Sequence, residues 1–453
     1  MLKKSLKLVL SIVLTLLCGV MTVFAMGDDV EIDVGNTSEK TYSITELGGK
    51  YKVQGRSTVI NNLLMTDYSA SGIEFSASCE GTVKVTFNAS SLTTNADGDG
   101  GCYFTVIVDG VKKARDFLKL TATGDTTVTI AEGLTAGKHT FEIYRQTEIE
   151  RATVGIKSIT LKGSFYNAPK NNDMYIEFIG DSITTAYGNL TLGSTNPVNP
   201  SYPLHQDATQ GYAYLTAKAL GADWSIVARQ GIGAVVGFQP VNMQTAYPLL
   251  RHAKDQNTPY DFARQPDVVV IGLGANDMST YLNNSMTIAD VKKGFSDMFD
   301  LVHEKNPDAK IVWVYGWINS SKNAGDTIKE VIAEKGGEEK GFYTLEVDQN
   351  SEGANGHSYY TAHAEYAKQL SAFINEISGE FIPGDIDNNG SFDLNDISAL
   401  AKYVAGWEPS VNVAALDPNG DSKVDLKDVT HLARVKAGWS NVTISDKEYK
   451  PNK

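Results

Sequence analysis

Ser182 is the residue whose type and setting first suggest chemistry. It ends a Gly-Asp-Ser tripeptide that directly follows an apolar run, 174–179, and so lies where a strand would end. A serine hydroxyl is a poor nucleophile until an imidazole takes its proton, and the ordinary pKa of histidine, ~6.5, suits this exchange near neutrality. Seven histidines compete for that role, at positions 139, 205, 252, 303, 357, 363 and 431. The tripeptide alone is a weak signal, because a serine at such a turn also caps helices.

Two further segments end apolar runs in the same way and supply groups that can bind an oxyanion. Gly231 follows the run 224–228 in Ala-Arg-Gln-Gly-Ile-Gly, and Asn276 follows the run 268–273 in Gly-Ala-Asn-Asp. Backbone amides and a carboxamide aimed at a developing oxyanion supply about 3 kcal/mol each in a dry site. Asn276 has a plain alternative as a turn residue. The sequence contains no Gly-x-Ser-x-Gly elbow, which argues against an ordinary α/β-hydrolase.

A second kind of chemistry is encoded near the C-terminus, in an internal repeat. Segments 385–407 and 417–439 have equal length and both end in Ala-Gly-Trp. Each opens with oxygen ligands at the loop positions that wrap a chain around a seven-coordinate hard cation. The expected ligands are Asp385, Asp387, Asn389, the Ser391 carbonyl, Asp393 and Asp396 in one loop, and Asp417, Asn419, Asp421, the Lys423 carbonyl, Asp425 and Asp428 in the other. Two structural calcium ions are therefore expected, with metal-free acidic surface loops as the alternative.

The composition limits the other functions open to the chain. With 453 residues, 42% of them hydrophobic and 21% charged, this is a globular protein long enough for about three domains. The formal net charge of −14 disfavours phosphate backbones and anionic lipid as partners. Nucleic acid is therefore not an expected ligand.

The first 25 residues have the pattern of an export signal. Lysines at 3, 4 and 7 precede an apolar run over 8–24, and Val-Phe-Ala closes the segment at a peptidase site. We predict a signal peptide over 1–25 and a secreted protein without membrane association after cleavage. The alternatives are an uncleaved anchor, since about 18 apolar residues can span a bilayer, and lipidation at Cys18. Cys79 and Cys102 then remain, either as a disulfide or as two buried thiols.

The patterns between these motifs predict three domains. Residues 30–165 contain short alternating runs rich in Val, Ile, Thr and Phe, which are typical of an antiparallel β-sandwich. Residues 171–380 alternate apolar runs with helical stretches, which indicates a three-layer α/β domain with a mainly parallel sheet. In such a sheet ligands bind at the carboxyl ends of the strands, the ends at which the candidate residues lie. Residues 384–440 are expected to form a small helical calcium-binding domain, followed by a tail, 441–453.

The C-terminal repeat resembles a known module. A paired loop and helix over 384–439, with Asp at position twelve and no entering helix, resembles the type I dockerin of cellulosomal enzymes. The resemblance implies a cohesin domain of a scaffoldin as partner, and an extracellular, cellulosome-bound protein. Loop positions ten and eleven, which help to choose the cohesin in that family, are Leu394-Asn395 and Leu426-Lys427 rather than Ser-Thr pairs. The cohesin type therefore stays open.

The blocks around Ser182, Gly231, Asn276 and His357, in this order, resemble the SGNH, or GDSL-like, esterases. Together with the preceding sandwich, they make residues 51–377 similar to the acetyl-xylan esterases of carbohydrate esterase family two, whose N-terminal domain is a jelly-roll. The resemblance implies Ser182 as nucleophile, His357 as base, and the N–H groups of Ser182 and Gly231 with the Asn276 side chain as oxyanion hole. It also implies hydrolysis of acetyl esters on plant polysaccharides through an acyl-serine intermediate, with no catalytic cofactor.

The sequence departs from the family pattern beside the histidine. The usual Asp two residues before it is Asn355, and the usual Pro after it is Ser358. The Asn355 amide, a backbone carbonyl or Glu352 is left to orient the imidazole, so we expect a Ser-His dyad. Exchanging Asp for Asn in a Ser-His-Asp triad costs about 10⁴ in rate. His205 is a rival base, and His363 is expected to have a supporting or structural role.

The substrate and two other functions remain open at this stage. Trp317, just after the run 311–315, has two interpretations, a platform for a sugar ring or a core residue. Asn355 favours a non-catalytic carbohydrate-binding protein carried on a scaffold, which the intact nucleophile, base and oxyanion residues oppose. The other alternative is a deacetylase of bacterial envelope glycans, which the resemblance to a dockerin disfavours.

Overall fold

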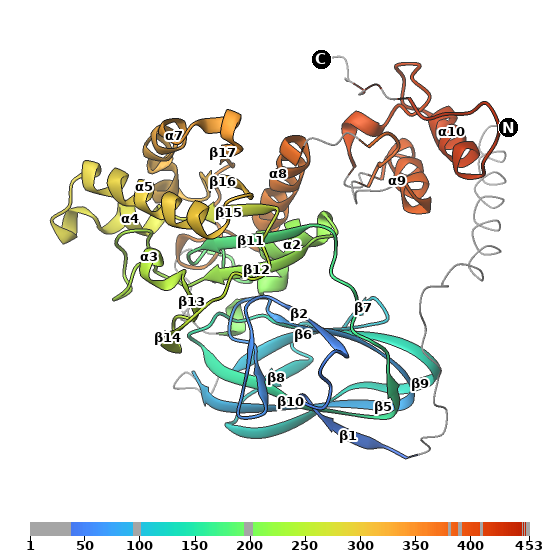
Figure 1. Ribbon diagram of the computed structural model, residues 1–453, viewed down its shortest axis with the longest axis horizontal. Coiled ribbons are helices and arrows are strands. Elements are labelled where there is room, and N and C mark those ends of the chain that lie inside the picture. The colour runs from blue at the N-terminus through green and yellow to red at the C-terminus, as the bar shows by residue number, and fades with distance from the viewer. Residues whose placement is uncertain are drawn as a thin grey trace.

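Three regions follow one another along the chain in the computed structural model (Figure 1). The structure describes residues 38–93, 101–193, 203–378, 382–387, 392–407, 411–445, 447 and 449. The predicted signal peptide, 1–25, and two expected metal ligands, Asn389 and Ser391, lie outside these residues. Within the described ranges, no helix has both the length and the apolar character needed to cross a membrane.

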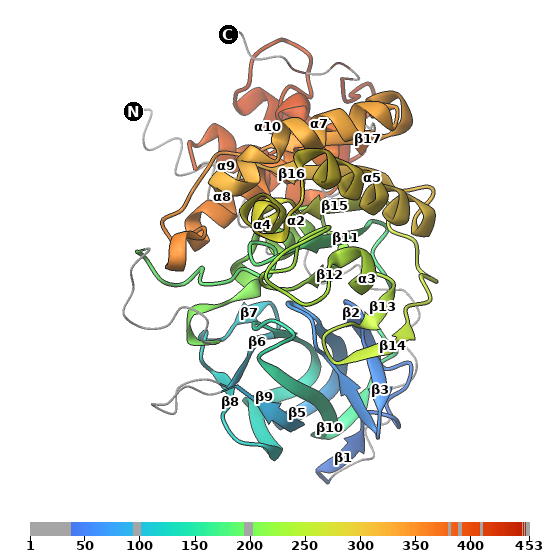
Figure 2. The ribbon, with the colours of Figure 1, turned by 90° about the vertical axis from the view of Figure 1, so that its left-hand side faces the viewer.

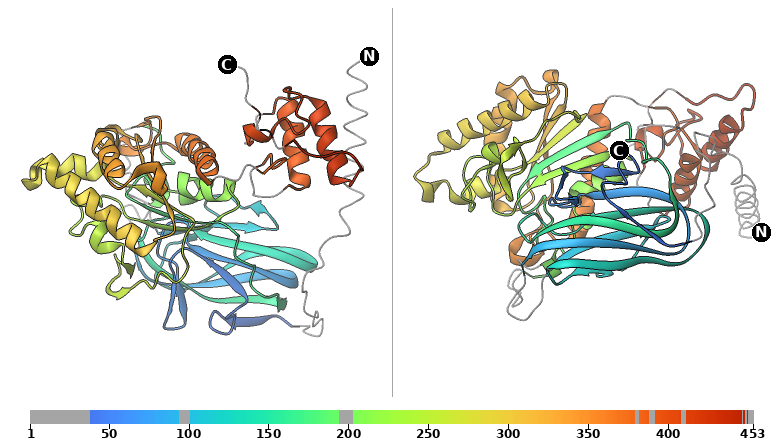
Figure 3. Two further views of the ribbon diagram at one scale, coloured as in Figure 1. Left: turned by 45° about the horizontal axis from the view of Figure 1, so that its top comes forward. Right: turned by 60° about the horizontal axis from the view of Figure 1, so that its bottom comes forward.

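The first region is an antiparallel sheet of ten strands, curved around one hydrophobic core (Figure 3). The strands are β1 (Lys40–Ser43), β2 (Tyr51–Gln54), β3 (Thr58–Ile60), β4 (Leu63–Met65), β5 (Gly72–Leu92), β6 (Cys102–Val108), β7 (Val111–Lys112), β8 (Leu118–Leu120), β9 (Gly124–Arg145) and β10 (Ala152–Phe165). The sequence predicted short strands throughout this region, whereas β5 runs for 21 residues. Irregular pairing between β5 and β9 at 79–84 bends the strand without ending it.

The two cysteines of this region are free and buried. Cys79 lies in β5 and Cys102 at the start of β6, where its Sγ is 3.3 Å from Oγ1 of Thr147. Burial raises the pKa of both thiols, that of Cys79 to about 11. The structure therefore favours buried thiols over a disulfide.

The second region has a five-stranded parallel sheet in the order β12-β11-β15-β16-β17. Its strands are β11 (Tyr175–Gly180), β12 (Asp223–Ala228), β15 (Val268–Gly272), β16 (Lys310–Tyr315) and β17 (Phe342–Glu346). Helices α2 (Tyr212–Ala219) and α8 (Tyr360–Ser378) cover one face, and α3 (Met243–Ala246), α5 (Ile288–Lys305) and α7 (Gly325–Glu334) cover the other (Figure 2). Alternate side chains along each strand enter two separate cores, which explains why the strands read as continuous apolar runs. The predicted three-layer α/β architecture is confirmed.

Shorter elements complete this region. They are the hairpin β13 (Leu249–Arg251) and β14 (Asp255–Pro259), the helices α4 (Ala275–Thr280) and α6 (Asn319–Asn323), and the 3₁₀ turns η1 (Pro203–His205), η2 (Ala208–Gln210), η3 (Leu282–Asn284), η4 (Gly337–Lys340) and η5 (Ala354–Gly356).

The first two regions share their cores and bury charges between them. Ala70, Ile107 and Tyr144 of the antiparallel region belong to the same buried cluster as Trp224 of the α/β region. Arg56, in the segment after β2, places its guanidinium 3.1 Å from a carboxylate oxygen of Glu177 in β11. Its other amino group donates to the carbonyls of Tyr247 and Leu249 at 2.6 and 3.0 Å. The two regions therefore pack as one body.

The third region consists of two helices, α9 (Leu394–Val404) and α10 (Leu426–Lys436), and the turn η6 (Val413–Ala415). They enclose a small core of their own, and Figure 1 shows them beyond the end of α8. Each helix begins with an aspartate N-cap, Asp393 or Asp425, in a capping box closed by Asp396 or Asp428. The carboxylates at loop positions nine and twelve therefore also start the helices.

Candidate active site

Ser182 lies at the carboxyl ends of the parallel strands, as the sequence predicted. Gly180, the last residue of β11, pairs with Ala228 of β12 on one side and with Gly272 of β15 on the other. Ser182, Gly231 and Asn276 follow these three residues within a few positions. The strand register therefore brings the three candidates to one edge of the sheet.

The serine and His357 are in hydrogen-bond contact. Ser182 Oγ lies 2.9 Å from Nε2 of His357, and Nδ1 of the same ring lies 3.2 Å from the backbone oxygen of Asn355. A proton on Nδ1 satisfies that carbonyl and leaves the Nε2 lone pair directed at the serine hydroxyl. Burial lowers the pKa of His357 below its ordinary value, which keeps the imidazole neutral and able to accept a proton.

The group that orients His357 is a backbone carbonyl. Asn355 has an exposed side chain and a φ of 54°, a left-handed conformation that asparagine tolerates better than most residues. Glu352, a second alternative, accepts instead from the Asn350 amide at 3.0 Å. Among the described residues, no carboxylate forms a hydrogen bond with His357. Of the three orienting groups expected, the structure provides the main-chain oxygen.

Two other histidines near the site have different partners. His205 lies in η1, and its Nδ1 is hydrogen-bonded to the Thr191 hydroxyl. His363, in α8, accepts the Tyr212 backbone N–H at Nδ1 over 3.2 Å, and burial lowers its pKa to about 3. His357 is thus the histidine that the fold brings to Ser182, and His363 has the structural setting that was expected.

Donors for an oxyanion surround the serine. Within the described part of the chain, the backbone N–H groups of Ser182 and Gly231 have no hydrogen-bond partner. Gly231 has a φ of +75°, which glycine adopts without strain. Asn276 is 9% exposed and donates through Nδ2 to Asp181 at 3.1 Å and to the Ile232 carbonyl at 2.9 Å. Both its amide hydrogens are therefore engaged, and an oxyanion would have to share one of them.

Asp277, to which the sequence analysis gave no role, holds the loop that carries Gly231. Its two carboxylate oxygens accept from the backbone N–H groups of residues 234–236 at 2.9, 2.8 and 3.0 Å. The loop is tight, since a Cβ added to Gly233 would lie 1.8 Å from the Val236 oxygen. The signal that could have revealed Asp277 is its position directly after Asn276 at a strand end.

The platform interpretation of Trp317 is wrong. The residue is 1% exposed, and its ring packs against Tyr212 and Tyr366 with centroid separations of 4.5 and 4.9 Å. The core alternative therefore holds. Two aromatic residues that the sequence analysis missed lie closer to the site: Tyr187, whose ring centroid is 4.7 Å from that of His357, and Phe238, which is 71% exposed and donates its N–H to the Gly231 carbonyl at 2.8 Å. No spacing pattern marks either residue.

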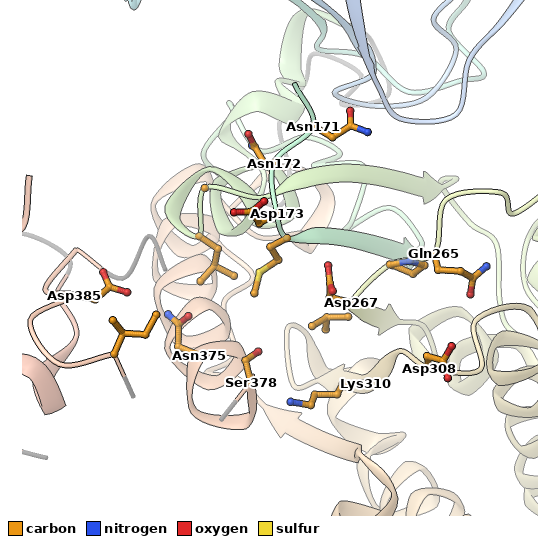
Figure 4. A pocket seen from close by; sticks show the side chains of 16 residues that line it. Asn171, Asn172, Asp173, Gln265, Asp267, Asp308, Lys310, Asn375, Ser378 and Asp385 are labelled. Carbon is orange, nitrogen blue, oxygen red and sulfur yellow. The ribbon is translucent and has the colours of Figure 1, made fainter. Parts of the chain in front are cut away.

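A cavity of about 910 Å³ lies elsewhere (Figure 4). Asp173, Asp267 and Lys310 line it, and these residues precede or begin strands β11, β15 and β16. The cavity is therefore at the amino ends of the sheet, opposite the edge that carries Ser182. It takes no part in the chemistry of the serine.

The two acidic loops fit a cation. Ligand oxygens of Asp385, Asp387 and Asp396 lie within 4.8 Å of one another in the first loop. In the second, Ser422 takes the left-handed conformation, with a φ of 65°, at the turn where glycine is usual. Asp428 is fully buried, and its Oδ1 has no hydrogen-bond partner among the described residues. Converging carboxylates and a buried, unpartnered oxygen are what a hard divalent ion satisfies.

Three family models match successive parts of the chain. They are the carbohydrate esterase 2 N-terminal domain over residues 54–169, the GDSL-like lipase/acylhydrolase family over 178–386, and the dockerin type I domain over 383–435. The chain combines these three domains. The two resemblances found in the sequence are thereby confirmed, and the last domain is of a calcium-binding type.

Sequence relatives support the esterase part. Cellulase/esterase CelE of Acetivibrio thermocellus is 28% identical over 310 residues, which are 64% of this chain and 36% of that protein. An acetylxylan esterase/glucomannan deacetylase of Cellvibrio japonicus is 28% identical over 263 residues, 54% of this chain and 68% of that protein. The chain thus matches little more than a third of the first relative's length.

Solved structures share the fold of the first two domains. A family two carbohydrate esterase from Clostridium thermocellum, in complex with cellohexaose, superposes with a TM-score of 0.64 at 26% identity, covering 73% of this chain and 99% of that one. An acetyl xylan esterase of Butyrivibrio proteoclasticus superposes with a TM-score of 0.65 at 21% identity, covering 76% and 100%. The second likeness concerns the fold alone.

Proposed function

We propose that this chain is a serine acetylesterase that removes acetyl groups from a hemicellulose, acetyl-xylan or a related polysaccharide. The observation that carries the proposal is the 2.9 Å contact between Ser182 Oγ and His357 Nε2 at the carboxyl edge of a parallel sheet. The acetylated polysaccharide is inferred from the relative named acetylxylan esterase/glucomannan deacetylase.

The dyad performs the reaction in two steps. Ser182 Oγ attacks the acetyl carbonyl carbon while its proton passes to His357 Nε2, and that proton then goes to the departing sugar oxygen. Water attacks the acyl-serine with His357 as base, acetate leaves, and Ser182 regains its proton. The N–H groups of Ser182 and Gly231, with the Asn276 amide, bind the oxyanion in both steps. The Asn355 carbonyl holds the ring through Nδ1 but stabilises imidazolium less than a carboxylate would.

The exposed ring of Phe238 supplies the sugar contact that Trp317 cannot. It projects from the loop after Gly231, and an aromatic face beside the oxyanion donors suits the apolar face of a pyranose ring.

The C-terminal domain attaches the esterase to a scaffold. We assign one calcium ion to each loop and a cohesin domain as the binding partner, which makes the chain an extracellular cellulosome component. The convergence of three carboxylates in the first loop and the buried oxygen of Asp428 in the second support two ions.

Acetate release from acetylated xylan and from 4-nitrophenyl acetate tests the catalytic proposal. Ser182→Ala should lower turnover of both by at least about 10³-fold, because loss of a nucleophile removes the covalent route. Normal turnover by the variant would refute the nucleophile. Absence of release by the wild-type protein would refute the esterase and favour the non-catalytic carbohydrate-binding alternative.

Calcium removal and ligand substitution test the attachment. Asp396→Ala combined with Asp428→Ala should abolish cohesin binding and leave esterase activity unchanged, since both carboxylates start dockerin helices far from Ser182. Calorimetric titration of the metal-stripped protein with calcium should report two sites per chain. Unchanged scaffold binding by the double variant would contradict the attachment.

A further inference from the structure

The loop between β9 and β10, residues 146–151, extends from the antiparallel domain to the edge of the α/β sheet. Ile149 is fully buried and belongs to the same α/β core cluster as Val227 and Ile232, which flank the segment leading to Gly231. Glu148 is fully buried as well. A buried carboxylate at a domain interface is costly unless it is paired and hydrogen-bonded, so its partners indicate what the loop does.

The Glu148 carboxylate has two partners, Gln230, the residue before the oxyanion donor, and Arg151 of its own loop. Glu148 Oε2 accepts the backbone N–H of Gln230 at 3.0 Å, and its Oε1 pairs with the Arg151 guanidinium at 2.6 Å. Arg151 also donates to the side-chain oxygen of Gln230. In the residue before Gln230, Arg229 Nε donates to Glu150 at 2.7 Å. The loop thus holds Arg229 and Gln230, two consecutive residues of the oxyanion segment, which we define as residues 229–236.

These contacts lie directly beside the peptide plane that carries the Gly231 N–H. The carbonyl of Gln230 and the N–H of Gly231 belong to the same planar trans unit and point in opposite directions. The carbonyl accepts the Gln239 side-chain amide at 2.7 Å, while Glu148 and Arg151 fix the rest of Gln230. The hydrogen bond to the Gln230 carbonyl therefore holds the plane that directs the Gly231 N–H, and Glu148 and Arg151 hold the residue to which that plane is joined.

The same network reaches the base. Burial raises the pKa of Tyr187 and the neighbouring Gln230 side chain opposes that rise, while the Tyr187 ring centroid lies 4.7 Å from that of His357. One side chain, Gln230, therefore connects the loop of the antiparallel domain to both sides of the site.

We propose that Glu148 and Arg151 are positioning residues, through which the N-terminal domain directs the Gly231 N–H at the oxyanion. The assignment rests on the proposed esterase function and deepens it. It makes the antiparallel domain part of the active site, because the oxyanion hole is incomplete without its loop.

The test compares Glu148→Ala and Glu148→Gln with a matched control, Asp67→Asn. Asp67 is also a buried carboxylate of the first domain, but its partner is Arg251 in β13, and within the described part of the chain no hydrogen bond or ion pair joins either residue to residues 229–231. Each protein is assayed in full length for kcat and KM on 4-nitrophenyl acetate and on its thiono analogue, in which sulfur replaces the carbonyl oxygen. Sulfur accepts hydrogen bonds weakly, so the rate ratio between the two esters reports the oxyanion donors and not the general integrity of the fold.

We expect Glu148→Ala to lower kcat on the oxygen ester by about 10- to 100-fold with KM nearly unchanged, and to lower the oxygen-to-sulfur rate ratio. Glu148→Gln keeps an acceptor for the Gln230 N–H and should recover part of the loss, while Asp67→Asn should leave the ratio at its wild-type value. If the wild-type enzyme is active and Glu148→Ala loses equal activity on both esters, or loses none, the positioning role is overturned while the proposed function stands. A wild-type protein inactive on both esters would overturn the proposed function and this assignment with it.

Discussion

The nucleophile and the base are held by different kinds of structure. Ser182 follows β11, which is hydrogen-bonded to β12 and β15 in the middle of the sheet. His357 follows the turn η5, in which Asn355 and Gly356 have φ angles of 54° and 73°. A ladder of strand hydrogen bonds fixes the first position, whereas local dihedral angles and one carbonyl fix the second.

This difference sets what each side tolerates. On the nucleophile side, buried carboxylates accept backbone N–H groups of the loop that carries Gly231, one at Glu148 and three at Asp277, so a lost acceptor leaves N–H groups unsatisfied at about 1–3 kcal/mol each. On the base side, a main-chain oxygen makes the contact and the Asn355 side chain is exposed. Side-chain changes should therefore cost much more on the nucleophile side.

Among the residues that support the nucleophile and the base, the largest effect is expected from Asp277→Asn. The amide keeps one accepting oxygen for the three N–H groups of residues 234–236 and turns a donor toward the others. We expect kcat on 4-nitrophenyl acetate to fall by about 10- to 10³-fold as the Gly231 segment loses its position.

Asp207→Asn is the matched control for Asp277→Asn. Asp207 is equally buried and accepts from the Thr209 N–H at 2.9 Å and the Gln210 amide at 3.0 Å, neither of which belongs to the loop that carries Gly231. It should lower the melting temperature and leave kcat near wild type. Similar kcat values for the two variants would show that Asp277 stabilises the fold without shaping the site.

The same contrast explains what the sequence could predict. The positions of Ser182, Gly231 and Asn276 followed from apolar runs, because parallel strands that end in register bring their next residues together. The platform interpretation of Trp317 was wrong because a tryptophan after a strand has the same sequence pattern whether it faces a cleft or the core. The packing of Tyr212 and Tyr366 against its ring decides between the two. Contacts between distant loops, such as that of Glu148 with Gln230, depend on how two domains dock and leave no periodic signal.

A smaller effect is expected at Asn355, where three substitutions separate side chain from backbone. Asn355→Gly keeps the left-handed conformation and the carbonyl, so kcat should stay within about twofold of wild type. Asn355→Ala pays about 1–2 kcal/mol for that conformation and should lower kcat by a few fold. A loss in Asn355→Gly as large as that in Asn355→Ala would mean that the side chain orients His357.

Asn355→Asp adds a pH dependence to this series. Burial lowers the pKa of His357, so kcat/KM of the wild-type enzyme should fall on the acid side only below the ordinary ~6.5 of histidine, as the base becomes protonated. A carboxylate near Nδ1 favours imidazolium and should move the acid limb to higher pH. An unchanged pH profile in Asn355→Asp would show that position 355 does not reach the ring through its side chain.

The smallest effect is on stability. Here a substitution on the nucleophile side should be favourable at high pH, whereas the substitutions above lower kcat. Burial raises the pKa of Asp181 to about 7, and the nearby charge of Asp277 adds to the shift. The folded state therefore holds a proton between the ordinary ~3.9 of aspartate and about 7 that the unfolded chain has released, so stability falls as pH rises through this window. Asp181→Asn removes the titration, and its melting temperature relative to wild type should be higher at pH 8 than at pH 4.5, by about 2–4 °C for each kcal/mol.

Asp290→Asn gives the opposite sign and completes the comparison. Hydrogen bonds from the Thr287 backbone and hydroxyl at the start of α5 lower the Asp290 pKa, so its contribution is present at neutral pH and is lost as pH falls. Its melting temperature relative to wild type should be lower at pH 8 than at about pH 3, because the contribution is lost only below the ordinary ~3.9 of aspartate. If both variants shift in the same direction, Asp181 carries no buried-charge cost. If they diverge, the Asp181 carboxyl beside the nucleophile keeps its proton up to about pH 7 and is ionised above that pH at a cost in stability, at the same sheet edge that fixes Ser182.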